Sequence, residues 1–360
     1  MLIVDAHRDI AYDALYFDRD YRRSVAETRR RDAELGFTET NGLATTGLPE
    51  AIAGDVAIVF ATLFVEPASY VAWGSMDKIR SLPRDLYKTP QEAHDFALKQ
   101  LEYYETITAE SDQLVLITTQ DDLDHVLSTW DSENPPEKRQ QGLVILMEGA
   151  DPVIEPAQFG DWYERGVRIL GTSWTGTRYA GGTNAPGPLT DLGRALLDEM
   201  ASYDAILDLS HMSEEACNAA LDRYEGNIVA THALPRHFCD TDRHLTDDQL
   251  KSLAEHGGVM GIVLLNALWN KDADPAIPVT LDNIVEVVDY VCQLTGSSAH
   301  AGIGTDWYAG TGASGVPDGL DSYADLGKVG EALRKQGYSE NDVKAILSGN
   351  MLRILRQTLP

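Results

Sequence analysis

The chain has 360 residues, of which 43% are hydrophobic, and its 57 acidic and 29 basic side chains give a net charge of −28. A chain this acidic repels nucleic-acid phosphates and anionic lipid headgroups, so we expect neither nucleic acid nor a membrane as a partner. The three cysteines are too few and too scattered for a disulfide scaffold or a CxxC metal knuckle. The first ten and last ten residues show no export signal, membrane span or lipid-anchor tail, and we expect a cytoplasmic protein.

Short runs rich in valine, isoleucine and leucine recur along the chain, and most precede a stretch with helical spacing. The clearest eight lie at residues 2–6, 55–65, 142–149, 167–173, 205–211, 227–233, 258–265 and 301–307. Eight apolar strands that alternate with helices predict an α/β fold, a TIM-type (β/α)8 barrel in a single domain over residues 1–360. A ninth run at 114–119 has two interpretations, an accessory strand outside the barrel or a sign that the sheet is open and doubly wound.

Two helices are marked by the residues at their amino-terminal ends. Residues 89–92 (TPQE) offer Thr89 as the N-cap, a proline at the first helical position and Glu92 to close a capping box. Residues 339–342 (SEND) have the same role before a C-terminal helical stretch. The proline-rich segments 133–138 and 184–189 predict surface connections.

Polar side chains collect where the apolar runs end. In a barrel, all of these would point into one mouth: His7, Asp9, Glu148, His211, His232 and Asp306. Residues two apart on an extended segment face the same side, so the first two aim an imidazole and a carboxylate at one point. One such histidine by itself is more typical of a structural position, but three in corresponding positions indicate a divalent-metal site. The nitrogen and oxygen ligands make zinc the first choice.

Glu148 has two carboxylate oxygens and can give one to each of two ions. Such a carboxylate holds the ions about 3.5–4 Å apart, the separation found in two-metal hydrolytic sites. Many metal-dependent hydrolases on this barrel bridge their ions with a carboxylated lysine, but no lysine ends any of the eight runs. A bridging role, if there is one, therefore falls to Glu148.

Together these residues resemble the membrane (renal) dipeptidase family, zinc peptidases within the amidohydrolase superfamily. The segment VDAHRDI is similar to the family's DGHND, and LMEGA, LDLSHMS, VATHALPR and GIGTDW follow in the family's order. The C-terminal GYSENDVKAILSGNMLRIL resembles the family's closing helices, so the resemblance covers nearly the whole chain. It implies a homodimeric metallo-dipeptidase that hydrolyses the peptide bond of a dipeptide.

The resemblance also implies a role for each ligand. His7 and Asp9 would bind a first zinc ion, His211 and His232 would bind a second, and Glu148 would bridge the two. A hydroxide shared by the ions would then attack the scissile carbonyl without a covalent intermediate.

Two further residues match the family's catalytic and substrate-binding positions. Asp306 would handle the proton of the bridging water and pass it to the leaving amine. Arg243 matches the arginine that grips the terminal carboxylate of the substrate, a bidentate task suited to a guanidinium. Without the resemblance, a surface ion pair would be the expected role of Arg243.

Two positions depart from the family pattern. Trp174 stands where reference members have a histidine that helps to hold the carbonyl oxygen, and an indole donates one hydrogen bond but cannot carry a proton. Tyr308 stands where the family often has a second aspartate. Both substitutions change the substrate pocket and leave the proposed metal ligands intact.

Other functions stay open on this sequence. A metal-dependent hydrolase of another small amide or lactone is compatible with Trp174. A catalytically silent binding protein that keeps the barrel, with or without a metal, is a second alternative, although retention of every ligand together with Asp306 argues against it. A redox enzyme has the least support, because neither a nucleotide-binding glycine fingerprint after the first strand nor a Walker loop is present.

Overall fold

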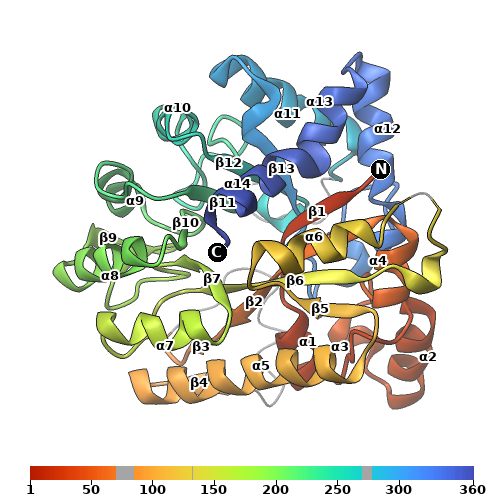
Figure 1. Ribbon diagram of the computed structural model, residues 1–360, viewed down its shortest axis with the longest axis horizontal. Helices are drawn as coiled ribbons and strands as arrows, with labels where there is room; N and C mark the ends of the chain where they lie inside the picture. Colours follow the sequence, from red (N-terminus) through yellow and green to blue (C-terminus); the bar gives the residue numbers. More distant parts are fainter. Residues whose placement is uncertain (70–84, 132, 270–277) are drawn as a thin grey trace.

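The computed structural model describes residues 1–69, 85–131, 133–269 and 278–360. Within these residues, eight parallel strands close into a barrel, because β2 (Val56–Phe64) pairs with β1 (Ile3–Arg8) on one side and with β6 (Gln141–Glu148) on the other (Figure 1). In order around the barrel, the strands are β1 (Ile3–Arg8), β2 (Val56–Phe64), β6 (Gln141–Glu148), β7 (Val167–Gly171), β10 (Ile206–Asp208), β11 (Ile228–Ala233), β12 (Val259–Val263) and β13 (Ala301–Gly304). The predicted TIM-type (β/α)8 barrel is confirmed.

The strands are continuous apolar runs because the barrel interior buries one face of each and helices cover the other. Every residue of β1, β2 and β6 is buried. The helices that surround them in Figure 1 are α1 (Ile10–Phe17), α2 (Val25–Leu35), α3 (Thr38–Asn41), α4 (Leu48–Ala53), α5 (Pro90–Glu110), α6 (Gln120–Ser128), α7 (Phe159–Glu164), α8 (Asp191–Ser202), α9 (Glu214–Leu221), α10 (Asp247–Glu255), α11 (Leu281–Thr295), α12 (Gly327–Gln336), α13 (Glu340–Lys344) and α14 (Asn350–Thr358). The predicted capping box of Thr89 and Glu92 begins α5.

The ninth apolar run forms β5 (Leu114–Leu116), which pairs with the start of β6. One edge of β6 is paired with β2 from Gly142 to Glu148. Its other edge is shared, since β5 takes the first residues and β7 pairs from Ile145 onward. β5 is therefore an accessory strand outside the barrel, and the alternative of an open sheet is wrong.

Outside the barrel, β3 (Glu66–Pro67) pairs with β4 (Leu86–Tyr87), and the segment after β7 folds into a hairpin of β8 (Ala180–Gly182) and β9 (Ala185–Leu189). Residues 184–189, predicted as a surface connection, are mostly exposed or half-buried, but all except Asn184 form strand β9 instead of an irregular turn. Asn184 adopts a left-handed backbone with φ of 58°, which asparagine tolerates in a turn, and this lets the chain reverse into β9. The hairpin lies against the segment after β10, where the Ser213 amide donates to the Gly181 carbonyl at 3.0 Å.

The C-terminal helix α14 covers the barrel end where the strands begin (Figure 1). The Asn350 side chain donates to the carbonyl of Ala301, the first residue of β13, at 2.8 Å. The Arg353 guanidinium donates to the carbonyl of Gly257, just before β12, at 2.7 Å. The carboxyl ends of the strands, where active sites of this fold lie, are at the opposite end.

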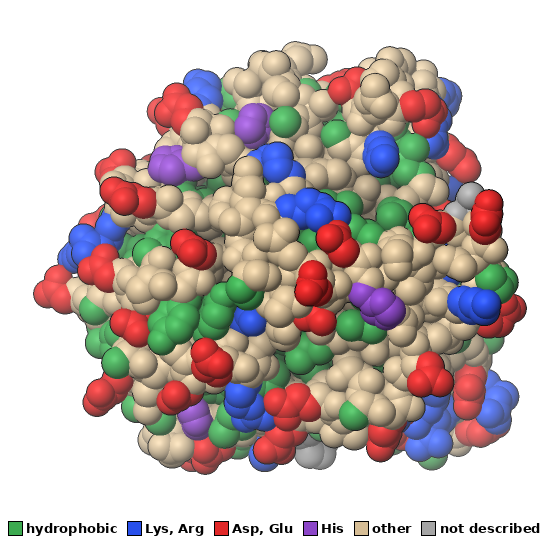
Figure 2. Space-filling model, in the orientation of Figure 1, with side chains coloured by type: hydrophobic (Ala, Val, Ile, Leu, Met, Phe, Trp, Pro, Cys, Tyr) green, Lys and Arg blue, Asp and Glu red, His purple; other side chains and the backbone are tan. Residues whose placement is uncertain are grey.

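Acidic side chains are spread over the face shown in Figure 2, with basic side chains between them. This distribution agrees with the absence of long single-sign blocks in the sequence. Among the described residues, no helix combines the length and the apolar character needed to cross a bilayer.

Candidate metal centre

The barrel brings the predicted ligands together at the carboxyl ends of five strands. Two overlapping groups have ligand atoms within 4.8 Å of one another: His7, Glu148 and His232, and His7, Asp9 and Asp306. His211 joins the first group, because its Nε2 lies 3.0 Å from the Nε2 of His232. All of these residues are at least largely buried.

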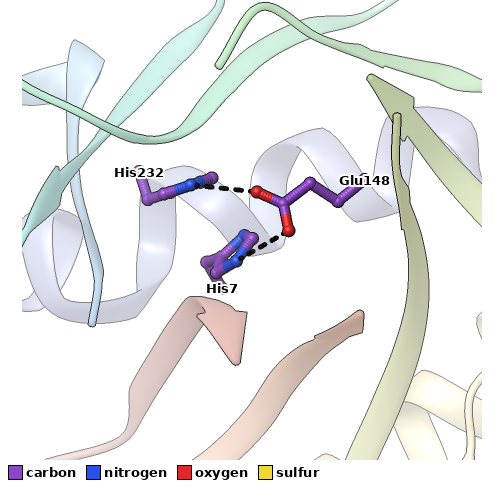
Figure 3. A group of neighbouring side chains, drawn as sticks. All are labelled: His7, Glu148 and His232. Carbon is purple, nitrogen blue, oxygen red and sulfur yellow. Dashed lines mark ion pairs between the residues drawn. The ribbon is translucent and has the colours of Figure 1, made fainter. Parts of the chain in front are cut away.

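Glu148 lies between the histidines and presents a different oxygen to each side (Figure 3). Its Oε2 is 3.7 Å from the Nε2 of His7. Its Oε1 is 3.0 Å from the Nε2 of His211 and 3.4 Å from the Nε2 of His232. This is the arrangement that a carboxylate shared between two cations requires.

The side of the centre near β1 is richer in carboxylates. The Nε2 of His7 is 3.9 Å from an oxygen of Asp9 and 3.7 Å from an oxygen of Asp306. The hydroxyl of Thr62 donates to Asp9 and holds that carboxylate in place. The two sides therefore differ in composition, with one imidazole on this side and two on the other.

Two of the site residues have a left-handed backbone, with φ of 68° at His211 and 55° at Asp306. A residue other than glycine pays about 1–3 kcal/mol for this conformation, and such strain gathers at functional sites. Each reversal follows the last residues of a strand, and the Asp306 amide then donates to the His7 carbonyl at 3.2 Å. The strain is thus located where the barrel strands turn into the mouth.

Burial dominates the protonation equilibria of the centre. It raises the pKa values of Glu148 and Asp306 well above their usual range, with the charge of Asp9 as the next cause, and it raises the pKa of Asp9 to about 6. It lowers the pKa values of the three histidines well below their usual range, and the positive charge of Arg243 contributes to each. The protein thus favours neutral imidazoles beside carboxylates that lack sufficient counter-charge.

His7 provides a test of whether these residues fit a metal ion. Neither of its ring nitrogens has a hydrogen-bond partner in the described part of the chain, although the side chain is fully buried. Buried polar atoms are almost always hydrogen-bonded, so an unpartnered imidazole facing carboxylates indicates a ligand position. Imidazole nitrogen and carboxylate oxygen are donors that zinc accepts, and the residues therefore fit the predicted metal.

Arg243 lies between β11 and α10 and is buried, which excludes the surface ion pair considered for it. Its Nη2 donates to the His232 carbonyl at 2.7 Å, whereas its Nε and Nη1 are buried without a hydrogen-bond partner. In the ranges that the structure describes, no carboxylate comes within ion-pair distance of this guanidinium. Two donor nitrogens therefore remain for an anionic ligand beside the cluster.

Trp174 is part of an aromatic wall next to the cluster. Its ring lies 4.8 Å from that of Phe64 in an edge-to-face arrangement and 6.2 Å from that of His211, measured between centroids. Tyr308 packs against the same group, which also contains Tyr12. The two departures from the family pattern thus meet in one apolar surface at the mouth.

Sequence reasoning missed two buried carboxylates beneath the site. Asp5 on β1 accepts hydrogen bonds from the Thr305 amide at 2.7 Å and hydroxyl at 2.6 Å. Asp208 on β10 accepts from the Thr231 amide at 2.9 Å and hydroxyl at 2.6 Å. The available signal was a charged residue inside an otherwise apolar run, in LIVDA and in AILDL.

Arg8, between two of the candidate ligands, faces away from them. Its Nε donates to the Thr46 hydroxyl at 3.1 Å, and its Nη2 pairs with the Asp13 carboxylate. Asp13 also accepts the Ala309 amide at 2.9 Å. Arg8 therefore fastens α1 to the segments around it.

A (β/α)8 barrel with histidines and carboxylates gathered at its carboxyl end has the features of the metal-dependent hydrolases. The chain belongs to the membrane dipeptidase family (peptidase family M19), whose model matches residues 1–359. This confirms the resemblance found in the sequence. The protein therefore combines the barrel fold with buried histidines and carboxylates of the kind that bind the metal in a metallopeptidase.

Individual relatives agree with this assignment. The chain is 30% identical over 240 residues to the "Uncharacterized protein in pqqA 5′ region" of Klebsiella pneumoniae, covering 64% of this chain and 87% of that protein. It is 26% identical over 278 residues to dipeptidase 3 of Rattus norvegicus, covering 72% of this chain and 51% of the relative. A metallopeptidase from Rhodobacter sphaeroides, solved with a phosphinate mimic of the dipeptide L-Ala-D-Ala, shares the fold with a TM-score of 0.77, 19% identity and 99% of each chain covered.

Proposed function

We propose that the protein is a binuclear zinc dipeptidase. The observation that carries this proposal is the position of Glu148, whose two oxygens face imidazoles on opposite sides. His7 and Asp9 would hold one ion, and His211 and His232 would hold the other. Bound zinc would supply a Lewis acid for the scissile carbonyl and lower the pKa of a coordinated water.

Asp306 is the proposed proton carrier. It is close to the first ion position, with its Oδ1 3.7 Å from the Nε2 of His7. From there its carboxylate can take the proton of the attacking water and deliver it to the leaving amine, which positioned carboxylates do in general acid–base catalysis.

Arg243 is the proposed binding group for the terminal carboxylate of the substrate. Its unpartnered Nε and Nη1 can both donate to one carboxylate, and a bidentate pair fixes the position of the bound end. The aromatic wall around Trp174 would contact a substrate side chain. A free carboxylate one residue beyond the scissile bond would then select dipeptides.

The test uses purified, zinc-loaded protein with a panel of L,L- and L,D-dipeptides and the same dipeptides as C-terminal amides. We expect turnover of the free acids, and we expect Arg243→Ala to lower kcat/KM about 30-fold or more on them, since a buried charged contact is worth about 2–5 kcal/mol. The variant should differ little from wild type on the amides. Failure to hydrolyse any dipeptide would overturn the assignment.

A second candidate is a hydrolase of another small amide or lactone. Trp174 favours it, because the indole beside His211 cannot carry a proton as a histidine could. In that case substrates without a free carboxylate would be turned over best, and Arg243→Ala would cost little. A zinc content near zero after supplementation would instead favour a silent relative.

A further inference from the structure

His232 is held by a hydrogen-bonded chain that begins at a buried carboxylate. The Thr231 hydroxyl is 2.6 Å from Oδ2 of Asp208, and the same hydroxyl oxygen is 2.9 Å from Nδ1 of His232. Asp208 comes from β10, and the other two come from the neighbouring strand β11. All three side chains are buried, so water does not compete for these bonds.

The chain has a defined direction because the threonine hydroxyl has one proton. Oδ1 of Asp208 already accepts the amides of Ser210 and Thr231, both at 2.9 Å, as a carboxylate does. Its Oδ2 is the nearest and the only charged acceptor among the contacts of the hydroxyl, and charged acceptors form the stronger bonds. The hydroxyl proton therefore points to Asp208, and Thr231 offers His232 a lone pair.

A lone pair opposite Nδ1 requires a proton on Nδ1. In the neutral ring, Nε2 then carries the free lone pair. That Nε2 is the atom that lies 3.4 Å from Oε1 of Glu148 and 3.0 Å from Nε2 of His211. The direction of the bonds thus presents a metal-binding lone pair to the centre of the cluster.

We propose that Asp208 and Thr231 are positioning residues that fix His232 in the tautomer with the proton on Nδ1, so that the ion position beside β10 and β11 is prepared before an ion binds. This inference deepens the proposed metal centre and rests on metal binding there. His7 offers the contrast, since both of its ring nitrogens are unpartnered in the described residues. At the position beside β1, no hydrogen bond from the described residues fixes the tautomer of the imidazole in this way.

The first test reads the tautomer directly in the metal-free full-length chain. Histidine is labelled with ¹⁵N, and two-bond ¹H–¹⁵N correlation spectra at mildly alkaline pH show which ring nitrogen carries the proton. His232 is assigned by comparison with H232Q. We expect a proton on Nδ1 in the wild type and in T231S, which keeps the hydroxyl, and loss of this fixed state in T231V.

Asp208→Asn gives the sharper result because it reverses the chain. The asparagine oxygen would keep the two amide donors, which places its NH₂ group against the Thr231 hydroxyl. The hydroxyl would then donate to Nδ1 of His232, and the proton of the ring should move to Nε2. A proton on Nε2 in the wild type, or an unchanged tautomer in folded D208N, overturns the proposal.

The second test measures zinc affinity by competition with a chromophoric chelator. We expect T231V and D208N to bind zinc about 10–100-fold more weakly at one position, the usual effect of removing a residue that orients a ligand. T231S should bind like the wild type. T305V is the matched control, since the Thr305 hydroxyl donates to Asp5 and we expect its zinc affinity to be unchanged.

The two tests separate this inference from the proposed function. Wild-type protein with the proton on Nδ1, weaker zinc binding by D208N and no hydrolysis of any dipeptide would leave the inference standing and remove the dipeptidase assignment. Folded T231V and D208N with wild-type zinc affinity would remove the inference alone. If T231V fails to fold, D208N supplies the same measurement with T231S as its folded reference.

Discussion

The seam between β1 and β13 and the seam between β10 and β11 use the same device. In each, a buried aspartate accepts both the amide and the hydroxyl of a threonine on the adjacent strand or directly after it, Asp208 from Thr231 on β11 and Asp5 from Thr305 after β13. In each, the threonine directly precedes a residue of the metal centre. Buried carboxylates satisfied in this way hold strand ends in a fixed register.

The two seams differ in what lies beyond the threonine. Asp5 accepts a further hydrogen bond from the Tyr323 hydroxyl, so that seam is tied to the segment between β13 and α12. At the other seam, the Thr231 hydroxyl contacts the ring of His232. In our proposal, the same carboxylate–threonine unit fastens strands at one seam and orients an imidazole at the other, because a histidine follows the threonine only at the second.

The largest effect is expected at the residue after Thr305. In the proposed function, Asp306 carries protons and His232, the residue after Thr231, binds an ion. Asp306→Asn should therefore lower kcat about 10²–10⁴-fold, the usual contribution of general acid–base catalysis. The amount of bound zinc should stay at the wild-type level. Steady-state kinetics with metal analysis of the same preparation checks this. Loss of zinc in the variant would instead indicate that Asp306 is a metal ligand, and the threonine at each seam would then precede a ligand.

A smaller effect is expected where the two seams touch. A Cβ on Gly304, the last residue of β13, would lie 2.0 Å from the Thr231 carbonyl oxygen. Gly304→Ala should therefore lower the free energy of unfolding by about 1–3 kcal/mol or more, as overpacking does. Urea denaturation measures it, with Gly327→Ala as the control, because nothing lies within 4 Å of a Cβ there. Equal stability of the two variants would show that the two seams are not in tight steric contact at Gly304.

The smallest effect is the difference between T231V and T305V in the metal-free protein. T231V deprives both Asp208 and His232 of a partner, whereas after T305V the Asp5 carboxylate keeps the Tyr323 hydroxyl. Because an unpaired buried polar group costs about 1–3 kcal/mol, T231V should be less stable than T305V by about 1 kcal/mol. Urea midpoints of the two variants give this difference, and equal midpoints would mean that the seams are energetically equivalent.

The predicted ligands were recognisable because strand ends are local features. The apolar runs stop at His7, Glu148 and His232, and parallel strands of a barrel bring such ends to one mouth. Asp208 was not recognised, because its partner Thr231 is 23 residues away and meets it only through the pairing of β10 with β11. A cytoplasmic location and a homodimer stay predictions.

We could predict the barrel, the residue types of the metal centre and the family from the sequence, because these depend on the order of apolar runs and on the residues that end them. Three features are visible only in the folded chain: β5 lies outside the barrel, Arg243 is buried with free donors, and Arg8 faces away from the cluster. The fold also brings the Thr231 hydroxyl into contact with both Asp208 and the imidazole of His232 on β11. Strand pairing and burial set these features, and neither is encoded in the spacing of residues along one segment.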